Sequence, residues 1–292
     1  MTPAVADAMG VTRLVRSAAS RLALARLAGI GLAMVVIGSL VLPPVIAALG
    51  AEGFGDVIGF AGMVAAVLWV VLGVSAARLG RRVREASALA SVGRADLAEG
   101  RALETLTSFC LLRPVTLGAA AVMARVRQSQ GRHAEAAGLA SFVLGRRERA
   151  LTGEKRGLRL LLAESLVELG EAEGARLALM PLYAPASSGK DRLTLPEALR
   201  LLGLQLRVQA LLNDWQAMHA RVASTLPMAE LMPPAEMARS TALLLRAAAE
   251  AGDEAWRTFL AQRVQLLADP EALQKAEPTL SGRLDGLLRG PA

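Results

Sequence analysis

The chain begins with two long apolar runs. Residues 27–51 and 57–77 contain no charged side chain and consist mainly of Leu, Val, Ile, Ala, Gly and Met. At about 1.5 Å of rise per residue, the first run would form roughly 37 Å of helix, which exceeds a hydrocarbon core of roughly 30 Å. A soluble helix has no need to be apolar on every face over such a length. The pattern therefore predicts a transmembrane helical hairpin over residues 27–77, with helices at about 27–49 and 57–77.

Beyond about residue 85 the pattern changes to apolar positions at helical spacing, without strand signals. A short phrase returns in VGRADLAEG (92–100), QGRHAEAAG (130–138) and LGEAEGARL (169–177), where a glycine is followed five residues later by alanine. LNDWQAMH (212–219) and AGDEAWRT (251–258) are looser copies. Gly or Asn tolerates the left-handed conformation that ends a helix, and a small residue one turn into the next helix lets two helices touch. The break residues, spaced 38, 39, 43 and 39 apart, are Gly93, Gly131, Gly170, Asn213 and Gly252.

These breaks predict helix pairs that bury their apolar faces only by stacking on one another. The first helix of the first pair is expected to continue directly from the second apolar run. The predicted domains are a basic N-terminal segment (1–26), the hairpin (27–77), a repeat domain (78–268) and a C-terminal cap or tail (269–292). The predicted pairs are 79–91 with 94–109, 114–130 with 132–146, 154–169 with 171–183, 196–212 with 214–226, and 234–251 with 253–267.

Two segments carry a resemblance to a known family. LLLAESLVELGEAEGARLAL (160–179) and VMARVRQSQGRHAEAAGLASFVL (122–144) resemble the tetratricopeptide (TPR) superfamily, and Met123-Ala124 and Leu162-Ala163 match its large-small pair on the first helix. The likeness covers roughly 85–268, with a longer period than the usual 34 or so residues and few aromatic residues. It implies an all-α fold, in which a TPR-like α-solenoid of about five helix pairs follows the hairpin.

Charge predicts how the hairpin is oriented. Basic residues near the ends of membrane spans stay on the cytoplasmic side. Arginines lie on the outer flanks of both runs, whereas the link GAEGFGD (50–56) has two acids and no base. We therefore expect a multi-pass protein of a bacterial inner (cytoplasmic) membrane, with its N-terminus and repeat domain in the cytoplasm; a cleavable signal peptide ending near Ala48 and Gly50 is the alternative. The flanking arginines are Arg13, Arg16, Arg21, Arg26, Arg78, Arg81, Arg82 and Arg84.

The net charge of +7 does not indicate nucleic acid as a partner. Residues 1–84 hold eight arginines against three acids, which leaves 25 bases and 23 acids for residues 85–292. The excess therefore belongs to the flanks of the apolar runs, where it favours anionic lipid head groups. Only three of the 33 basic residues are lysine, which together with abundant Ala, Leu, Arg and Gly suggests a GC-rich bacterial genome.

No motif for catalysis, a metal or a cofactor is recognisable. His133 and His219 fall in different repeats and lack the neighbouring ligands of a zinc site. Cys110 is the single cysteine, so an internal disulfide is impossible, and its apolar context favours a buried small hydrophobe over a nucleophile. The sequence predicts a non-enzymatic protein without cofactors.

The family resemblance instead implies a concave surface, lined by the first helix of each pair, that binds a protein partner. Several residues in that register are arginines, which bind carboxylates through a bidentate fork. An acidic segment or a C-terminal carboxylate is the expected ligand, although an ordinary solvated helix face remains the alternative. The predicted partner-binding residues are Arg125, Gln128, Glu164, Glu168, Arg200, Arg207, Arg239 and Arg246.

Three functions are compatible with this layout. The first is a membrane-anchored scaffold or adaptor that recruits a partner through its repeats. The second is a structural subunit of a membrane transport or secretion assembly, for which Pro43-Pro44 and the glycines of the spans are the only indication. The third follows from a resemblance to an inner-membrane family associated with haem biosynthesis, which has two N-terminal spans followed by tetratricopeptide repeats; the basic RRVRE after the second span adds to that likeness.

Overall fold

The structure, a computed structural model, describes residues 3–48, 54–110, 112–146, 152–183 and 193–289. Within these residues the chain is entirely helical, with fourteen α-helices, short 3-10 turns and no strand. The all-α prediction is therefore confirmed. Much of the predicted link (50–56) lies outside the described residues.

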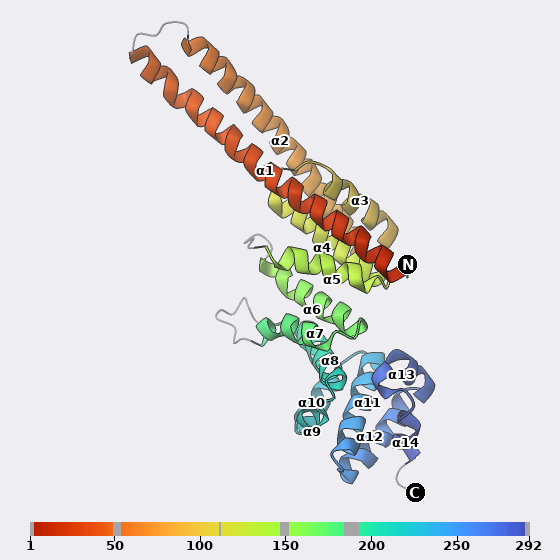
Figure 1. Cartoon of the computed structure of the whole chain (residues 1–292). Coiled ribbons are helices and arrows are strands. Elements are labelled where there is room, and N and C mark those ends of the chain that lie inside the picture. The colour runs from red at the N-terminus through yellow and green to blue at the C-terminus, as the bar shows by residue number, and fades with distance from the viewer. Residues whose placement is uncertain (1–2, 49–53, 111, 147–151, 184–192, 290–292) are drawn as a thin grey trace. The chain divides into compact units, whose positions relative to one another are not determined.

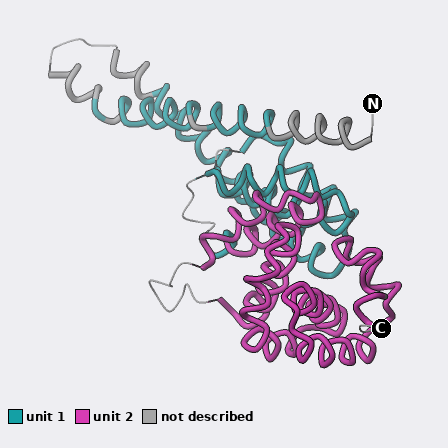
Figure 2. Tube along the Cα trace, turned by 60° about the horizontal axis from the view of Figure 1, so that its bottom comes forward, with its two compact units in different colours: residues 1–155 teal, residues 156–292 magenta. Residues whose placement is uncertain are grey.

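The chain forms two compact units, Met1–Lys155 and Arg156–Ala292 (Figure 2). In the first unit, α1 (Pro3–Ala48) and α2 (Phe54–Ser91) lie side by side as a long antiparallel pair (Figure 1). Helices α3 (Ala95–Thr107), α4 (Arg113–Ser129) and α5 (His133–Leu144) pack around one end of that pair. The helix expected over 79–91 is the continuation of α2, as predicted.

Two helices of the described chain, α1 and α2, are long and apolar enough to cross a membrane. The apolar windows are Arg16–Ser39 on α1 and Phe60–Ser91 on α2, and only 12% and 17% of them, respectively, are buried. Leu27, Met34, Phe60 and Val70, among others, are each more than half exposed. Such exposure is unlike the core helix of a soluble protein, whose apolar side chains are covered.

Residues 18–25 of α1 contribute to the first unit's core. Ala18, Leu22 and Ala25 are buried, and α1 contacts α4 and α5 as well as α2. A guanidinium nitrogen of Arg21 donates to the carbonyl oxygen of Leu106 at 2.9 Å. The basic segment expected over 1–26 is therefore continuous with the first apolar run, since α1 has no break between Pro3 and Ala48.

The second unit is a succession of shorter helices. Its elements are α6 (Thr152–Glu168, which begins at the end of the first unit), α7 (Ala172–Leu179), η2 (Met180–Leu182), α8 (Leu195–Leu211), α9 (Trp215–His219), α10 (Val222–Ala229), α11 (Pro234–Glu250), α12 (Glu254–Leu267), α13 (Pro270–Ala276), η4 (Pro278–Leu280) and α14 (Leu284–Arg289).

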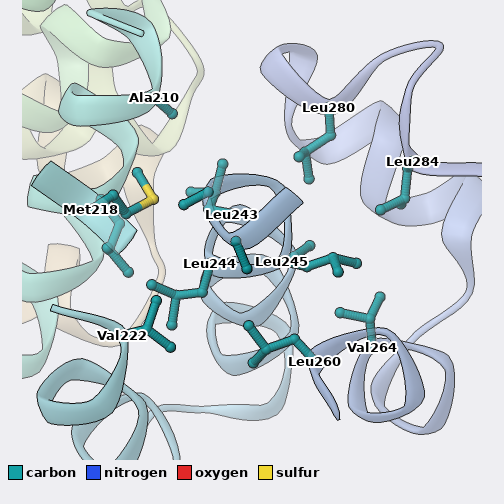
Figure 3. Packing of buried hydrophobic residues seen from close by; sticks show 14 of the residues in the cluster. Ala210, Met218, Val222, Leu243, Leu244, Leu245, Leu260, Val264, Leu280 and Leu284 are labelled. Carbon is teal, nitrogen blue, oxygen red and sulfur yellow. The ribbon is translucent and has the colours of Figure 1, made fainter. Parts of the chain in front are cut away.

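Helix α11 lies at the centre of a core cluster of the second unit. Leu243, Leu244 and Leu245 are almost completely buried there, and residues from α8 to α14 surround them. Figure 3 shows Leu280 and Leu284 among the same group of side chains. The C-terminal region expected as a cap or tail thus contributes to this core over its described part.

Five helices end in the same type of turn. Gly93, Gly131, Gly170, Asn213 and Gly252 all have positive φ, between 56° and 80°, as predicted. At each one the residue's N–H donates to the carbonyl three residues earlier, and the next N–H reaches five residues back, which is the Schellman arrangement. Ala98, Ala136 and Ala175 are fully buried, as the repeated phrase predicts.

One predicted helix is wrong. The segment 214–226 forms two helices, α9 and α10, separated at Ala220 and Arg221. Helix α10 then continues past Pro227 to Ala229, where the Pro227 ring sits inside the helix. The periodicity of apolar residues continues through the break, since Met218 and Val222 are both buried, so the pattern contained no sign of it.

Candidate functional site

The second unit contains a pocket of about 580 Å³. Helices α8 and α11 form its sides, with one residue from α6 and the short connection before α11. Most of its lining is aliphatic, with three arginines and two glutamates among the lining residues. The lining comprises Glu164, Leu195, Pro196, Leu199, Arg200, Gly203, Leu204, Arg207, Leu231, Met232, Pro233, Glu236 and Arg239.

Local sequence fixes the two helix starts at this pocket. Thr194 caps α8 through a capping box, in which its hydroxyl accepts from the N–H of Glu197 and the Glu197 carboxylate accepts from the N–H of Thr194. These bonds lower the pKa of Glu197 below its ordinary value, the bond from the Thr194 backbone being the largest cause. Pro196 and Pro234 occupy the first turns of α8 and α11, where a missing backbone donor costs little.

Two predicted arginines face the pocket and are partly exposed. Arg200 forms an ion pair with Glu164 on α6, and the Arg200 side chain is 45% exposed. Arg239 lies 3.5 Å from Glu236 on its own helix. The Nε of Arg239 is buried and has no hydrogen-bond partner in the described part of the chain. We call Arg200 and Arg239 the pocket pair.

Arg207 is held differently, although it also lines the pocket. Its side chain is 7% exposed and binds two carboxylates, Glu168 on α6 and Glu277 after α13, each at 2.9 Å. Burial opposes its charge, yet Glu277 and Glu168 outweigh that effect and raise the pKa of Arg207. Glu277 is itself 2% exposed, so this is a buried ion pair.

Arg246 is the second buried arginine. Its guanidinium lies over the ring of Trp215, 4.2 Å from the ring centroid, and donates to the carbonyl oxygen of Thr279. Burial, together with the nearby charge of Arg283, lowers the pKa of Arg246 despite the presence of Glu250. We call Arg207 and Arg246 the buried pair.

The remaining two predicted residues, Arg125 and Gln128, lie on α4 in the first unit. Arg125 forms a 3.4 Å ion pair with Glu154. Four of the eight predicted residues therefore line the pocket: Glu164, Arg200, Arg207 and Arg239. Of the other two in the second unit, Glu168 binds Arg207, and Arg246 contacts Trp215 and Thr279.

Two of the three side chains considered for catalysis or metal binding, Cys110 and His219, contact neighbouring residues in the structure. Cys110 is buried beside Ala76 and Leu79, and burial raises the pKa of its thiol, which makes it a poor nucleophile. His219 lies 3.1 Å from Asp253. The residues that the structure describes contain no group of His, Cys, Asp and Glu with metal-binding geometry.

Sequence reasoning missed the apolar wall formed by Leu231, Met232 and Pro233, and it missed Glu277. The wall residues follow α10, where the register of the repeats gives no groove positions. Glu277 lies 70 residues from Arg207. A lone acid within AEPTL (276–280) is the only sequence signal for that contact.

Comparison with models of known protein families, with curated proteins and with solved structures finds no match to this chain.

Proposed function

We propose that the chain is a membrane-anchored, non-catalytic interaction scaffold or adaptor, whose TPR-like helical domain recruits a protein partner. The pocket between α8 and α11 carries this proposal, because it is large, mainly aliphatic and edged by arginines and glutamates. Pockets with an apolar floor and a few polar groups are the usual form of a binding site.

The exposed apolar surface of α1 and α2 supports the membrane part of the proposal. Two adjacent helices that leave most of an apolar window uncovered require a non-aqueous environment or a partner. The arginine flanks favour an orientation in which both ends of the hairpin lie on the cytoplasmic side of a bacterial inner membrane.

The five identical helix-ending turns support a repeat architecture. Each turn reverses the chain after one helix and starts the next, and a fully buried alanine lies five residues beyond three of them. A stack of such helix pairs, with a pocket between the first helices of two neighbouring pairs, is the arrangement of a TPR-like α-solenoid.

A photo-cross-linking amino acid placed at Leu231 tests the recruitment of a partner. Leu231 lines the pocket and is 58% exposed, so the probe would lie where a partner binds. The matched control carries the same probe at Leu266 on α12, which is 86% exposed and outside the pocket. We expect a discrete cross-linked product in living cells from position 231 only; the same products from both positions, or none, would contradict the proposal.

Cysteine labelling tests the proposed topology. In a Cys110→Ser background, a membrane-impermeant thiol reagent should label Ala51→Cys in intact cells whose outer barrier is permeabilised. Val92→Cys, at the exposed end of α2, should react only after the cells are lysed. Labelling of Val92→Cys in intact cells would place the helical domain on the opposite side.

A further inference from the structure

Helices α8 and α11 carry arginines at matching positions. Arg200 and Arg207 are seven residues apart on α8, and Arg239 and Arg246 are seven residues apart on α11. Seven residues correspond to two helical turns, or about 10.5 Å along each helix. Arg200 and Arg239 therefore lie on nearly the same faces of α8 and α11 as Arg207 and Arg246, two turns closer to the N-terminus of each helix.

At the buried pair, the chain's own C-terminal segment acts as a bound peptide. Arg207 binds the carboxylate of Glu277, and Arg246 binds the backbone carbonyl two residues later, at Thr279. The Thr279 hydroxyl donates to the second carboxylate oxygen of Glu277 at 2.9 Å, so both oxygens have a donor. Leu280 follows directly and is fully buried in the core.

The pocket pair has equivalent carboxylate partners on α6 and α11 but no such segment. Arg200 binds Glu164 just as Arg207 binds Glu168, one turn further along α6. The second carboxylate that Arg207 receives has no counterpart at Arg200 among the described residues. Arg239 pairs with Glu236 at 3.5 Å on its own helix, as Arg246 pairs with Glu250 at 3.7 Å.

The apolar lining also matches such a segment. Beside the buried pair, Leu280 fills a site in the core, whereas beside the pocket pair the exposed aliphatic surface of Leu195, Leu199 and Leu231 lines an open pocket. Arg200 and Arg239 each already have one carboxylate partner, Glu164 and Glu236. The likeness to the buried pair is therefore one of arrangement and not of excess positive charge.

We propose that the pocket binds an extended acidic segment of a partner protein, in which a carboxylate side chain contacts Arg200 and a backbone carbonyl two residues later accepts from Arg239. A neighbouring aliphatic side chain of the segment covers Leu199 and Leu231. This inference rests on the proposed function, because it specifies the chemistry that the recruitment pocket recognises. The bound segment would repeat the arrangement that residues 277–280 adopt at the buried pair.

The test is selection from a displayed library of short random peptides by the purified full chain in detergent. Individual selected peptides are then measured by fluorescence anisotropy against the full chain, the double variant Arg200→Gln/Arg239→Gln and the control Arg263→Gln. Arg263 on α12 is a suitable control because it also pairs with a glutamate, Glu230, and lies outside the pocket. Thermal unfolding of each variant verifies that it is folded.

We expect Asp or Glu beside an aliphatic residue in the selected peptides. Losing the charged hydrogen bonds in the double variant should weaken binding at least about tenfold, whereas Arg263→Gln should change it by less than about twofold. Replacing the acid of a selected peptide by its amide should reproduce the loss, and this second measurement does not depend on the folding of a variant.

Selection without an acidic preference, or binding that Arg200→Gln/Arg239→Gln leaves unchanged, would overturn the inference. Selection of no peptide would overturn it as well. Cross-linking from position 231 reports separately on the proposed function: a specific product there combined with no acidic preference would leave the scaffold standing and remove only this ligand.

Discussion

The buried pair and the pocket pair lie on the same two helices, with the same residue type and the same spacing, yet they have different surroundings. Arg207 and Arg246 are enclosed by Glu277, Thr279 and Trp215, whereas the Arg200 side chain is 45% exposed. Helical register therefore sets which arginines face the space between α8 and α11. The C-terminal segment covers Arg207 and Arg246, which therefore belong to the core, and leaves Arg200 and Arg239 available to a partner.

The largest expected effect is that of Arg207→Met. The substitution leaves the buried carboxylate of Glu277 without its cation, which costs roughly 3–5 kcal/mol of unfolding free energy. Unfolding of the full chain in detergent, followed by the fluorescence of Trp215 and Trp256 in a Trp69→Phe background, measures the loss.

The double variant Arg207→Met/Glu277→Leu is the control for that measurement. Replacing both charges of a buried pair by apolar groups is often close to neutral, so much of the lost stability should return. A loss below about 1 kcal/mol in the single variant would show that Glu277 behaves as a surface charge.

Leu280→Ala is expected to have the next largest effect on stability. Leu280 is fully buried in the core around α11, and truncating such a leucine costs about 2–5 kcal/mol. The same change at Leu266, which is 86% exposed, should be nearly neutral. Equal effects at the two leucines would mean that the C-terminal segment does not occupy the buried pair in solution.

A pH effect of smaller size is expected at the pocket end of α8. Because its folded-state pKa is lowered, ionised Glu197 stabilises the folded state above its ordinary pKa of 4.5, and this contribution disappears as the pH falls through the lower folded-state value. Glu197→Gln should cost up to about 1 kcal/mol at neutral pH. The difference in unfolding free energy between wild type and variant should vanish in acid; a difference independent of pH would contradict the capping box.

Gly203→Ala should stabilise the protein. Gly203 is inside α8, and an added Cβ would lie 3.9 Å from Glu236 Oε2 and Met232 Cε, an ordinary contact distance. The gain in helix propensity is roughly 0.5–1 kcal/mol. At Gly118 of α4 the added Cβ would meet Val83 Cγ1 at 3.3 Å, so the matched change there should gain less. Thermal unfolding distinguishes the two, and a loss at Gly203 would mean that the pocket floor is tighter than described.

Arg200→Met is expected to have the smallest effect on stability. Its ion pair with Glu164 is substantially exposed, and such pairs contribute between 0 and about 1 kcal/mol. The contrast with Arg207→Met, measured in the same unfolding assay, tests the comparison of the two pairs directly. A cost similar to that of Arg207→Met would show that both pairs are structural.

The sequence predicted the features that depend on local chemistry. Gly93 and Asn213 end helices because few other residues adopt positive φ readily, so their role could be predicted without a structure. The interaction of Arg207 with Glu277 joins residues 70 positions apart, and no local pattern specifies such a contact. For the same reason the register placed Arg200, Arg207 and Arg239 among the groove residues, and these three line the pocket, but it did not predict that Arg246 would be held by Trp215 and Thr279.

The unbroken helices of the first unit have a mechanical consequence. Both α1 and α2 continue from their apolar windows into the packed end of the unit, without a hinge in either. In the proposed membrane arrangement, two helices packed side by side would resist twisting, so α3 to α5 could not rotate independently of the hairpin. Any tilt of the hairpin, for example in a bilayer of different thickness, would be transmitted as an equal tilt of these helices and would change the direction in which they face.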